Sequence, residues 1–429
     1  MAKTYRPYVP EQDLLLPPSL RDWLPEHHLA FFVADLIDHL DLSAITAVYE
    51  DEERGYPPYH PVMLTKVVVY AYCVGVFSSR KIQRRLIEDV AFRVLAAGNE
   101  PDFRTIADFR KRHLAALQGF FEQVLQVARD LGTLRVGRIA LDGTKVKANA
   151  SKHKAMSFGR MKDKARQLRD EVTQLLAQAE ATDAAEDAEY GADSRGDELP
   201  AELQRRESRL KRIREATRAL KARAKEDAAA AGEPEESAKP DSKAQYNFTD
   251  PESRIMKGPD GFVQAYNAQV AVNEDQLIIG QAVTQETNDK KQLMPMIATI
   301  EEQSGATPTQ LLADAGYCSD ENLAAIADTT IDTYISTRKQ KHGERPGPCP
   351  RGPMPTPATR VDRMARKLLT KAAAAVYARR KAIVEPVIGQ IKQARGFRQF
   401  LLRGIENVQG EWALVCTTHN ILKLYRLYG

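Results

Sequence analysis

The sequence contains few cysteines, and none of them forms a Cys-x-x-Cys pair. Its 429 residues include only four, which lie far apart at Cys73, Cys318, Cys349 and Cys416. A zinc knuckle needs paired cysteine ligands, and a disulfide-rich secreted domain needs a denser framework. The scarcity of cysteine argues against both classes and indicates a reducing compartment.

Long apolar runs and a leader pattern are also missing. The longest apolar run, residues 62–77, covers about 16 residues and contains Lys66, so it is too short to cross a bilayer. The opening residues, MAKTYRPYVP, lack the charged and then apolar pattern of a secretory signal. We therefore expect a soluble, cytoplasmic protein without a membrane partner.

The order of apolar patterns predicts a mixed α+β fold with two domains. Residues 1–133 show helical apolar spacing throughout, which predicts an all-helical N-terminal domain. The apolar pattern of residues 134–429 predicts a domain that contains strands. Its strand near Arg138–Leu141 is followed, after an interruption, by strands near 261–272 and 276–284, and then by alternating helices and strands. This order predicts a mixed sheet with helices on its faces.

The interruption is a charged helical segment. Residues 159–182 and 202–227 carry apolar residues at three- and four-residue spacing, and they flank an acidic loop. With the flexible linker that follows them, they predict an inserted helical arm and linker over residues 151–245. Two arrangements fit this pattern. The arm pairs with another protomer, or it folds back as a hairpin within one chain.

The charge of the chain is concentrated in its C-terminal part. The net charge is only +4, but residues 360–398 contain eleven Lys and Arg against two acids, Asp362 and Glu385. Such an excess suits a polyanion such as nucleic acid. A solvated helix face explains the charge alone equally well.

Two aspartates follow apolar strands, and one glutamate lies in the basic helix. Asp142 ends the strand of "RIALDGTK", and Asp314 ends that of "LLADAGY". If these strands are neighbours, both carboxylates lie at one edge of the sheet. Glu385 offers a third carboxylate. Phosphodiester chemistry uses two magnesium ions about 3.5–4 Å apart, held by a few carboxylates.

Helical spacing relates several side chains to Glu385. Tyr377, Lys381 and Lys392 fall on roughly its face of a helix expected from about residue 363 to 394, whereas Arg380, five residues before Glu385, is expected to point away. The alternative is a plain surface ion-pair face. Lys145 and Lys147 follow Asp142 and are expected either to contact DNA phosphates or to be solvated loop charges.

These motifs together resemble the DDE transposases of bacterial insertion sequences, in the branch with an InsH-type N-terminal domain. "ALDGTKVKANAS" resembles the first aspartate motif, "LLADAGYCSDEN" the second, and "VYARRKAIVEPVIGQIKQARGF" the signature with Tyr, Arg, Glu and Lys. Tyr377 lies one residue farther from Glu385 than in the family pattern, so Lys381 takes the place of the family arginine.

The resemblance implies a ribonuclease H-like core in residues 134–429 and a DNA-binding, transposase-associated domain in residues 1–133. It implies that Asp142, Asp314 and Glu385 are the catalytic residues and hold two Mg²⁺ ions, for which Mn²⁺ can substitute. The residues implied to contact DNA are Lys145, Lys147, Tyr377, Lys381 and Lys392.

The implied function is a transposase that binds the ends of an insertion sequence, cleaves phosphodiesters and joins the 3′-OH ends to target DNA. The implied partners are double-stranded DNA of the element ends and the target, and other copies of the chain in a homodimer or higher oligomer, in the bacterial cytoplasm on the nucleoid. Two alternatives remain from the residues. One is an architectural or regulatory DNA-binding protein with a dimerising arm, and the other is a related nuclease without strand transfer.

Overall fold

The computed structural model describes residues 19–50, 57–190, 201–230, 234, 238–258, 261–338, 347–354 and 356–429. The acidic loop expected between the arm helices includes residues 191–200, and the expected linker includes 231–233 and 235–237. These segments lie outside the described residues. Within the described ranges, no helix is long and apolar enough to cross a membrane.

The part of the chain before the sheet is helical, which confirms that prediction. After the short 3-10 helix η1 (Leu20–Trp23), the described residues form α1 (Leu29–His39), α2 (Ser43–Glu50), α3 (Pro61–Cys73), α4 (Ser79–Glu88), α5 (Val90–Leu95), α6 (Phe103–Arg112) and α7 (Leu114–Asp130). Local capping begins several of these helices. At the start of α6, for example, Asp102 Oδ1 accepts a hydrogen bond from the Thr105 backbone N–H at 2.7 Å.

The sheet is mixed, as the order of patterns predicted. Its strands are β1 (Arg138–Lys147), β4 (Arg254–Gly258), β5 (Gly261–Asn273), β6 (Ile278–Thr284), β7 (Gln310–Ala313) and β8 (Asp332–Ile335). They lie in the order β4-β5-β1-β7-β8, and β6 also pairs with β5. Strand β5 is antiparallel to β1, β4 and β6, whereas β7 is parallel to β1 and β8.

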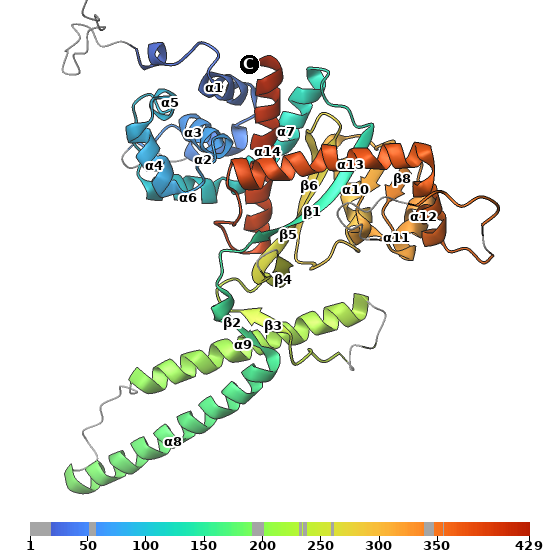
Figure 1. The fold of residues 1–429 in the computed structure, drawn as a ribbon. Helices are drawn as coiled ribbons and strands as arrows, with labels where there is room; N and C mark the ends of the chain where they lie inside the picture. Colours follow the sequence, from blue (N-terminus) through green and yellow to red (C-terminus); the bar gives the residue numbers. More distant parts are fainter. Residues whose placement is uncertain are drawn as a thin grey trace, which may run out of the picture.

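Helices cover both faces of this sheet (Figure 1). On one face, α10 (Leu293–Ser304) and α11 (Asp320–Ala327) share a buried cluster with β1, β6 and β7. On the other face lie α13 (Lys371–Gly389) and α14 (Ile405–Tyr428). The single helix expected over 363–394 is instead α12 (Arg360–Leu369), α13 and a π-helical turn (Gln390–Ala394). Thr370 separates α12 from α13 because it is extended and its side chain caps the second helix.

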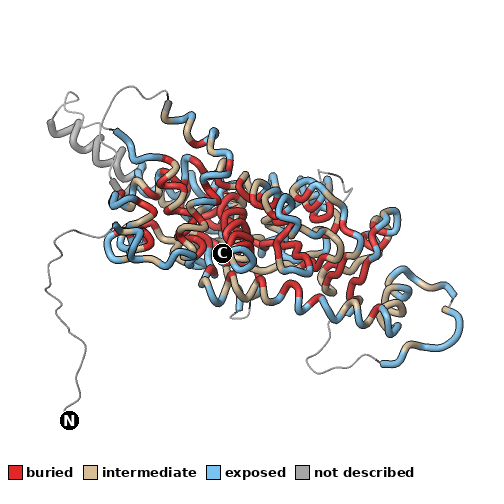
Figure 2. Tube along the Cα trace, turned by 90° about the horizontal axis from the view of Figure 1, so that it is seen from above, coloured by how far each residue is buried: buried red, intermediate tan, exposed pale blue. Residues whose placement is uncertain are grey.

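The N-terminal helices pack directly on the sheet domain. One buried cluster includes residues of α1, α3 and α7 together with residues of β1, β5, α13 and α14. Figure 2 shows the buried chain concentrated in the middle of the molecule, around α14. A buried polar network also crosses this contact, because Tyr72 Oη on α3 donates to Glu411 on α14 at 3.3 Å and accepts from Arg110 on α6 at 3.0 Å.

The arm projects away from the sheet beyond β4 (Figure 1). Its helices are α8 (Phe158–Tyr190) and α9 (Ala201–Ala230), and its base is a two-stranded sheet of β2 (Ala155–Ser157) and β3 (Gln245–Asn247), preceded by the 3-10 turn η2 (Lys152–Lys154). The two helices pack against each other through a small apolar cluster that includes Met161, Leu168, Leu210 and Ile213. Within the described residues the arm is therefore a hairpin of one chain.

Candidate active site

Asp142 lies on β1, and Asp314 directly follows the adjacent parallel strand β7. In the pairing of β1 with β7, Ala140 lies opposite Leu312. The same register, continued by two residues, sets Asp142 beside Asp314, which directly follows β7 and caps the 3-10 turn Ala315–Tyr317. Because side chains alternate along a strand, Asp142 lies on the face of Ala140, where α13 packs.

Asp142 does not end its strand, which corrects the sequence-based expectation. Strand β1 runs on to Lys147, and Asp142 pairs with Val270 of β5. The sequence suggested an end because the apolar residues stop at Leu141. Only the parallel ladder to β7 stops there, whereas the antiparallel ladder to the long strand β5 continues. Lys145 and Lys147 are consequently strand residues and not loop residues.

Arg380 contacts Asp142. It lies off the face of Glu385, as its spacing predicted, so what is wrong is the expectation that the Glu385 face of the helix points to the carboxylates. Arg380 Nη1 lies 3.3 Å from Asp142 Oδ2, and the two side chains are 10% and 21% exposed. The prediction failed because it took Glu385 as the centre of the inward face. Helix α13 instead buries Arg380 with Ile383, Val384 and Val387, and this apolar stripe sets its rotation against the sheet.

Burial dominates the electrostatics of Asp142. It raises the pKa of Asp142 to about 6, with a further increase from Asp314 and with Arg380 acting in the opposite direction. Tyr377 lies beside Arg380, and burial raises the pKa of its phenol. Lys381 is exposed, and it lines a pocket of about 660 Å³ with Tyr377, between α12 and α13.

Glu385 is not gathered with the two aspartates. Its side chain is exposed, and it makes no hydrogen bond or ion pair with other described residues. In the part of the chain that the structure describes, no group of three or more His, Cys, Asp or Glu side chains is placed to hold a metal ion. The expected convergence of three carboxylates is therefore absent from this arrangement, and the role of Glu385 stays a prediction.

Lys392 packs against β1 just beyond Asp142. Its Nζ donates to Thr144 Oγ1 at 2.6 Å and to the Lys145 backbone oxygen at 2.7 Å. Burial lowers the pKa of Lys392 to about 8, reinforced by Arg398 and Lys145. Lys145 is half-buried, and its Nζ makes no hydrogen bond among the described residues. Lys147 is exposed.

Asp289 is a third carboxylate beside the pair, and the sequence reasoning missed it. It lies between β6 and α10, and its Oδ1 accepts from Asn267 Nδ2 and Gln269 Nε2, each at 2.7 Å. A Cβ on Gly143 would lie 2.4 Å from the same oxygen. The glycine after Asp142 is therefore needed for this close approach. In the sequence, Asp289 is indicated only by that glycine and by the polar segment "ETND" between a strand and a helix.

The second aspartate motif approaches the same carboxylate. A Cβ on Gly316 would lie 2.9 Å from Asp314 Oδ1 and 3.2 Å from Asp289 Oδ2. Lys145 Nζ lies 3.9 Å from Asp289 Oδ1. Asp142, Asp289 and Asp314 thus share one region at the meeting of β1, β5 and β7, with Arg380 and Lys145 as the nearby cations.

Two family models match the chain. Residues 18–112 match a model described as "Transposase domain (DUF772)", and residues 237–421 match one described as "Transposase DDE domain". The chain belongs to the insertion-sequence DDE transposases. Comparison with curated proteins and with solved structures returned no match.

The matched ranges divide the candidate site of this transposase. Asp314 and Glu385 fall within the DDE match, whereas Asp142 lies between the two matched ranges. The pairing of β1 with β5 and β7 joins Asp142 to the matched part. The arm helices also lie outside both matches, so the arm is a feature on which the family models are silent.

The donor chemistry of the site fits a hard divalent cation. DDE transposases generally depend on divalent metal ions. Magnesium takes oxygen ligands, and it is often held by one or two carboxylates together with substrate phosphates. Asp142 and Asp314 supply two such carboxylates, one on a strand and one at the end of its neighbour, and Arg380 is a cation already placed against the first.

Proposed function

We propose that this transposase binds the ends of its insertion sequence, cleaves a phosphodiester at each end and joins the freed 3′-OH to target DNA. The observation that carries the proposal is the register of β1 and β7, which sets Asp142 beside Asp314. Two carboxylates, one on a strand and one at the end of its neighbour, suit metal-assisted phosphoryl transfer, and the DDE match supports that chemistry.

The topology of the sheet supports a ribonuclease H-like core. Strands β1, β5 and β6 form an antiparallel meander, and β7 and β8 follow as parallel strands separated by helices. We propose residues 134–429 as this catalytic domain, with residues 151–245 as its insertion, and residues 1–133 as an associated DNA-binding domain. The double-stranded DNA of the element ends and of the target is the proposed partner.

In this mechanism Asp142 and Asp314 would hold the metal ions, and Glu385 is proposed as the third ligand. When bound, Mg²⁺ would polarise the scissile phosphate and stabilise the leaving oxygen. Arg380 keeps the Asp142 carboxylate oriented through its guanidinium. Lys392 holds β1 next to the site through Thr144. Lys145, whose Nζ lacks a hydrogen bond among the described residues, is suited to a phosphate oxygen.

The test is DNA cleavage and strand transfer with magnesium, measured on a duplex that carries the element's terminal sequence. Asp142→Asn and Asp314→Asn should abolish both reactions and leave DNA binding intact, because they remove ligands and keep the shape of the side chain. Full activity of either variant would remove that residue from the site. Cleavage without joining by the unaltered protein would instead identify a nuclease. Loss of DNA binding along with cleavage in the asparagine variants would contradict the proposed roles, because the two aspartates would then act in binding.

The third ligand is decided by a matched pair of substitutions. Glu385→Gln should abolish cleavage if Glu385 completes the site when DNA binds. Asp289→Asn should retain measurable cleavage, because Asp289 is already satisfied by Asn267 and Gln269. The reverse result would assign the third carboxylate to Asp289 and remove Glu385 from the site.

The roles of Arg380 and Lys381 are distinguished by another pair of substitutions. Arg380→Ala should lower cleavage by about 10–100-fold, the usual cost of losing a partner that orients a ligand. Lys381→Ala should affect mainly DNA binding, since Lys381 is exposed. Arg380→Lys should restore part of the activity because it keeps the charge. A larger cleavage defect for Lys381→Ala than for Arg380→Ala would overturn this assignment.

A further inference from the structure

The proximal half of the arm is strongly basic. Residues 158–177 of α8 and 204–229 of α9 contain fifteen Lys and Arg against seven Asp and Glu, an excess of eight, whereas the whole chain has a net charge of only +4. The rest of the chain is therefore net negative. A concentration of this kind on one projecting element indicates a surface for a polyanion.

A groove at this part of the arm is lined by charges of one sign. It has a volume of about 770 Å³ and lies between β2 and the N-terminal half of α9. Its apolar lining includes Met156, Ile213 and Phe248. No aspartate or glutamate lines it among the described residues, and its cationic or titratable side chains are His153, Lys154, Arg205, Arg209 and Arg212.

The three arginines of the groove form a row. Arg205, Arg209 and Arg212 follow i, i+4 and i+7 spacing, which puts them on one face of α9 over roughly 10 Å of helix. They are exposed, and they and Lys154 have no hydrogen-bond or ion-pair partner for their side chains among the described residues. Their neighbour Arg206 differs, because its Nε lies 3.1 Å from Glu171 Oε2 of α8. The groove cations are thus available to an external anion.

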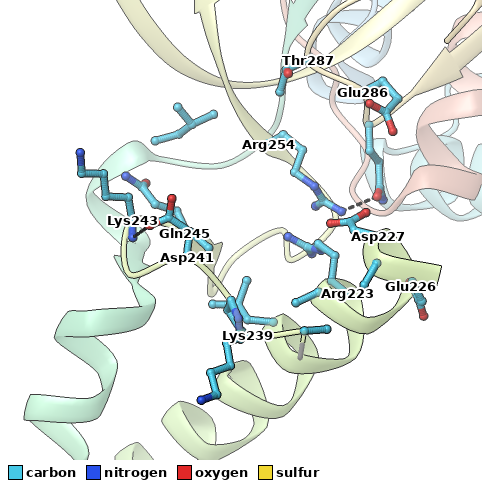
Figure 3. A pocket seen from close by; sticks show the side chains of 18 residues that line it. Arg223, Glu226, Asp227, Lys239, Asp241, Lys243, Gln245, Arg254, Glu286 and Thr287 are labelled. Atoms are coloured by element: carbon cyan, nitrogen blue, oxygen red, sulfur yellow. Dashed lines mark hydrogen bonds between the residues drawn. The ribbon is translucent and has the colours of Figure 1, made fainter. Parts of the chain in front are cut away.

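A second pocket, at the base of the arm, has a different character. It measures about 820 Å³ and is lined by equal numbers of both signs, namely Arg223, Lys239, Lys243, Arg254, Glu226, Asp227, Asp241 and Glu286. Figure 3 shows the guanidinium groups of Arg223 and Arg254 beside the Asp227 carboxylate.

One contact in the basal pocket joins the arm to the segment before β4. Arg223 of α9 donates to the Pro251 backbone oxygen at 3.3 Å, and Arg254 of β4 donates to Gln285. Burial, reinforced by Arg223, lowers the pKa of Arg254 to about 10. Both cations are engaged within the chain, unlike the groove arginines, and the Arg223 contact joins α9 to the segment that leads into β4.

We infer that the groove between β2 and α9 holds the sugar-phosphate backbone of double-stranded DNA, as a site separate from the carboxylate site. The inference rests on the proposed action of the transposase on DNA. Arginine binds phosphate oxygens in a bidentate manner, and duplex DNA carries about one negative charge per 1.7 Å of its axis. A row of about 10 Å therefore faces roughly six phosphate charges.

The experiment compares two triple variants of the full-length protein. One replaces the groove row, Arg205→Gln with Arg209→Gln and Arg212→Gln. The matched control replaces three exposed cations on the opposite face of the same helix, Lys211→Gln with Arg214→Gln and Arg218→Gln. Both remove three charges from α9. Binding to a labelled duplex of random sequence is measured by fluorescence anisotropy over a potassium chloride series, with EDTA present so that no cleavage occurs.

The groove variant should reduce the slope of log K against log salt by about 2.7, from roughly 0.9 for each lost phosphate contact. The control should reduce it by less than half as much. Equal slopes for the two variants would overturn the inference, provided that circular dichroism shows unchanged helix content in both. Unchanged DNA binding with a loss of oligomer in light scattering would also overturn it, because the groove would then hold another copy of the chain.

A failure of the proposed catalysis gives a different result. If Asp142→Asn leaves cleavage intact but the groove variant loses its salt dependence, the catalytic proposal fails and the DNA-binding groove stands. If cleavage requires Asp142 but both triple variants bind alike, the groove inference fails alone.

Discussion

The arm and the body of the molecule differ greatly in the size of their buried apolar clusters. Among the described residues, the arm, α8 and α9 with β2 and β3, has eight buried apolar residues in its cluster. In the body, which comprises all other elements, one cluster runs from the N-terminal helices through one face of the sheet to α13 and α14, and a second fills the other face. The arm is long but thin, so most of its surface stays in water.

Charged residues have different roles in the two regions. The buried charged residues of the body have partners within the chain, as with Arg380 against Asp142 and Glu411 beside Tyr72. In the arm the groove arginines face water without a partner among the described residues. The body therefore carries the fold and the site, and the arm contributes a charged surface. Substitutions in the two regions should have correspondingly different effects.

The largest expected effect is on the shared core of the body. Trp412 is 1% exposed, packs near Phe397 and Phe400, and donates from Nε1 to the Gln269 backbone oxygen at 3.2 Å. Trp412→Ala should lower the free energy of unfolding by about 3–5 kcal/mol. Denaturant unfolding followed by circular dichroism measures the loss.

The other tryptophan provides the control for that change. Trp23 is 57% exposed, so Trp23→Ala should change the free energy of unfolding by less than about 0.5 kcal/mol. If the N-terminal helices and the sheet unfolded in separate transitions in the Trp412 variant, the shared core would not act as one unit.

The next effect should be confined to the arm. Leu210 is 5% exposed in the cluster between α8 and α9. Leu210→Ala should destabilise the hairpin by roughly 2–4 kcal/mol. Hydrogen exchange should then quicken in the arm helices while the midpoint of the body stays unchanged. Leu176→Ala, at a side chain that is 40% exposed, is the matched control with little effect. Faster exchange in the sheet would show that arm and body are coupled.

A smaller effect concerns pH and lies in α14. Burial and Arg395 lower the pKa of His419 from 6.5 to about 3, and its Nε2 bonds the Gln276 backbone oxygen at 3.0 Å. Since the folded pKa is depressed, this contribution to stability is complete above about pH 6.5 and is lost as the pH falls toward the folded value. The loss amounts to about 1.4 kcal/mol per pH unit in that window.

Replacement of His419 by a residue that does not titrate should flatten the pH dependence of the free energy of unfolding. His419→Gln keeps a donor for the Gln276 oxygen but does not ionise between pH 7 and pH 4. The measurement is the free energy of unfolding against pH for both proteins, and the difference between the two slopes isolates His419. Parallel curves would mean that folding does not lower the pKa of His419.

The smallest effect on the body should follow from removal of the arm. Replacement of residues 161–237 by a short flexible linker should shift the body's free energy of unfolding by less than about 1 kcal/mol, because closure entropy changes slowly with loop length. The readout is the cooperative transition of the body. Its disappearance would show that the arm belongs to the core, and the comparison between the two regions would fail.

Much of the secondary structure was accessible from local patterns. The helical N-terminal part, the meander of strands and the arm helices each follow from apolar spacing within one element. Predictions from local patterns were wrong where an element's extent depends on the segments that pack beside it. Asp142 lies within a strand because β5 extends past β7, and the long basic helix is divided at Thr370 because that residue is extended and caps α13.

For this protein, the sequence by itself determined the types of its elements and the two aspartates at the ends of apolar runs, since both are properties of neighbouring residues. Only the tertiary structure decided that Arg380 and not Lys381 meets Asp142, that Asp289 packs over Gly143, and that the N-terminal helices share a core with the sheet. These features arise from the pairing of distant strands and from the rotation of α13 that buries its apolar stripe. The apolar stripe of α13 is present in its own sequence, but the pairing of the strands and the surface against which the stripe packs depend on which parts of the chain become neighbours when it folds.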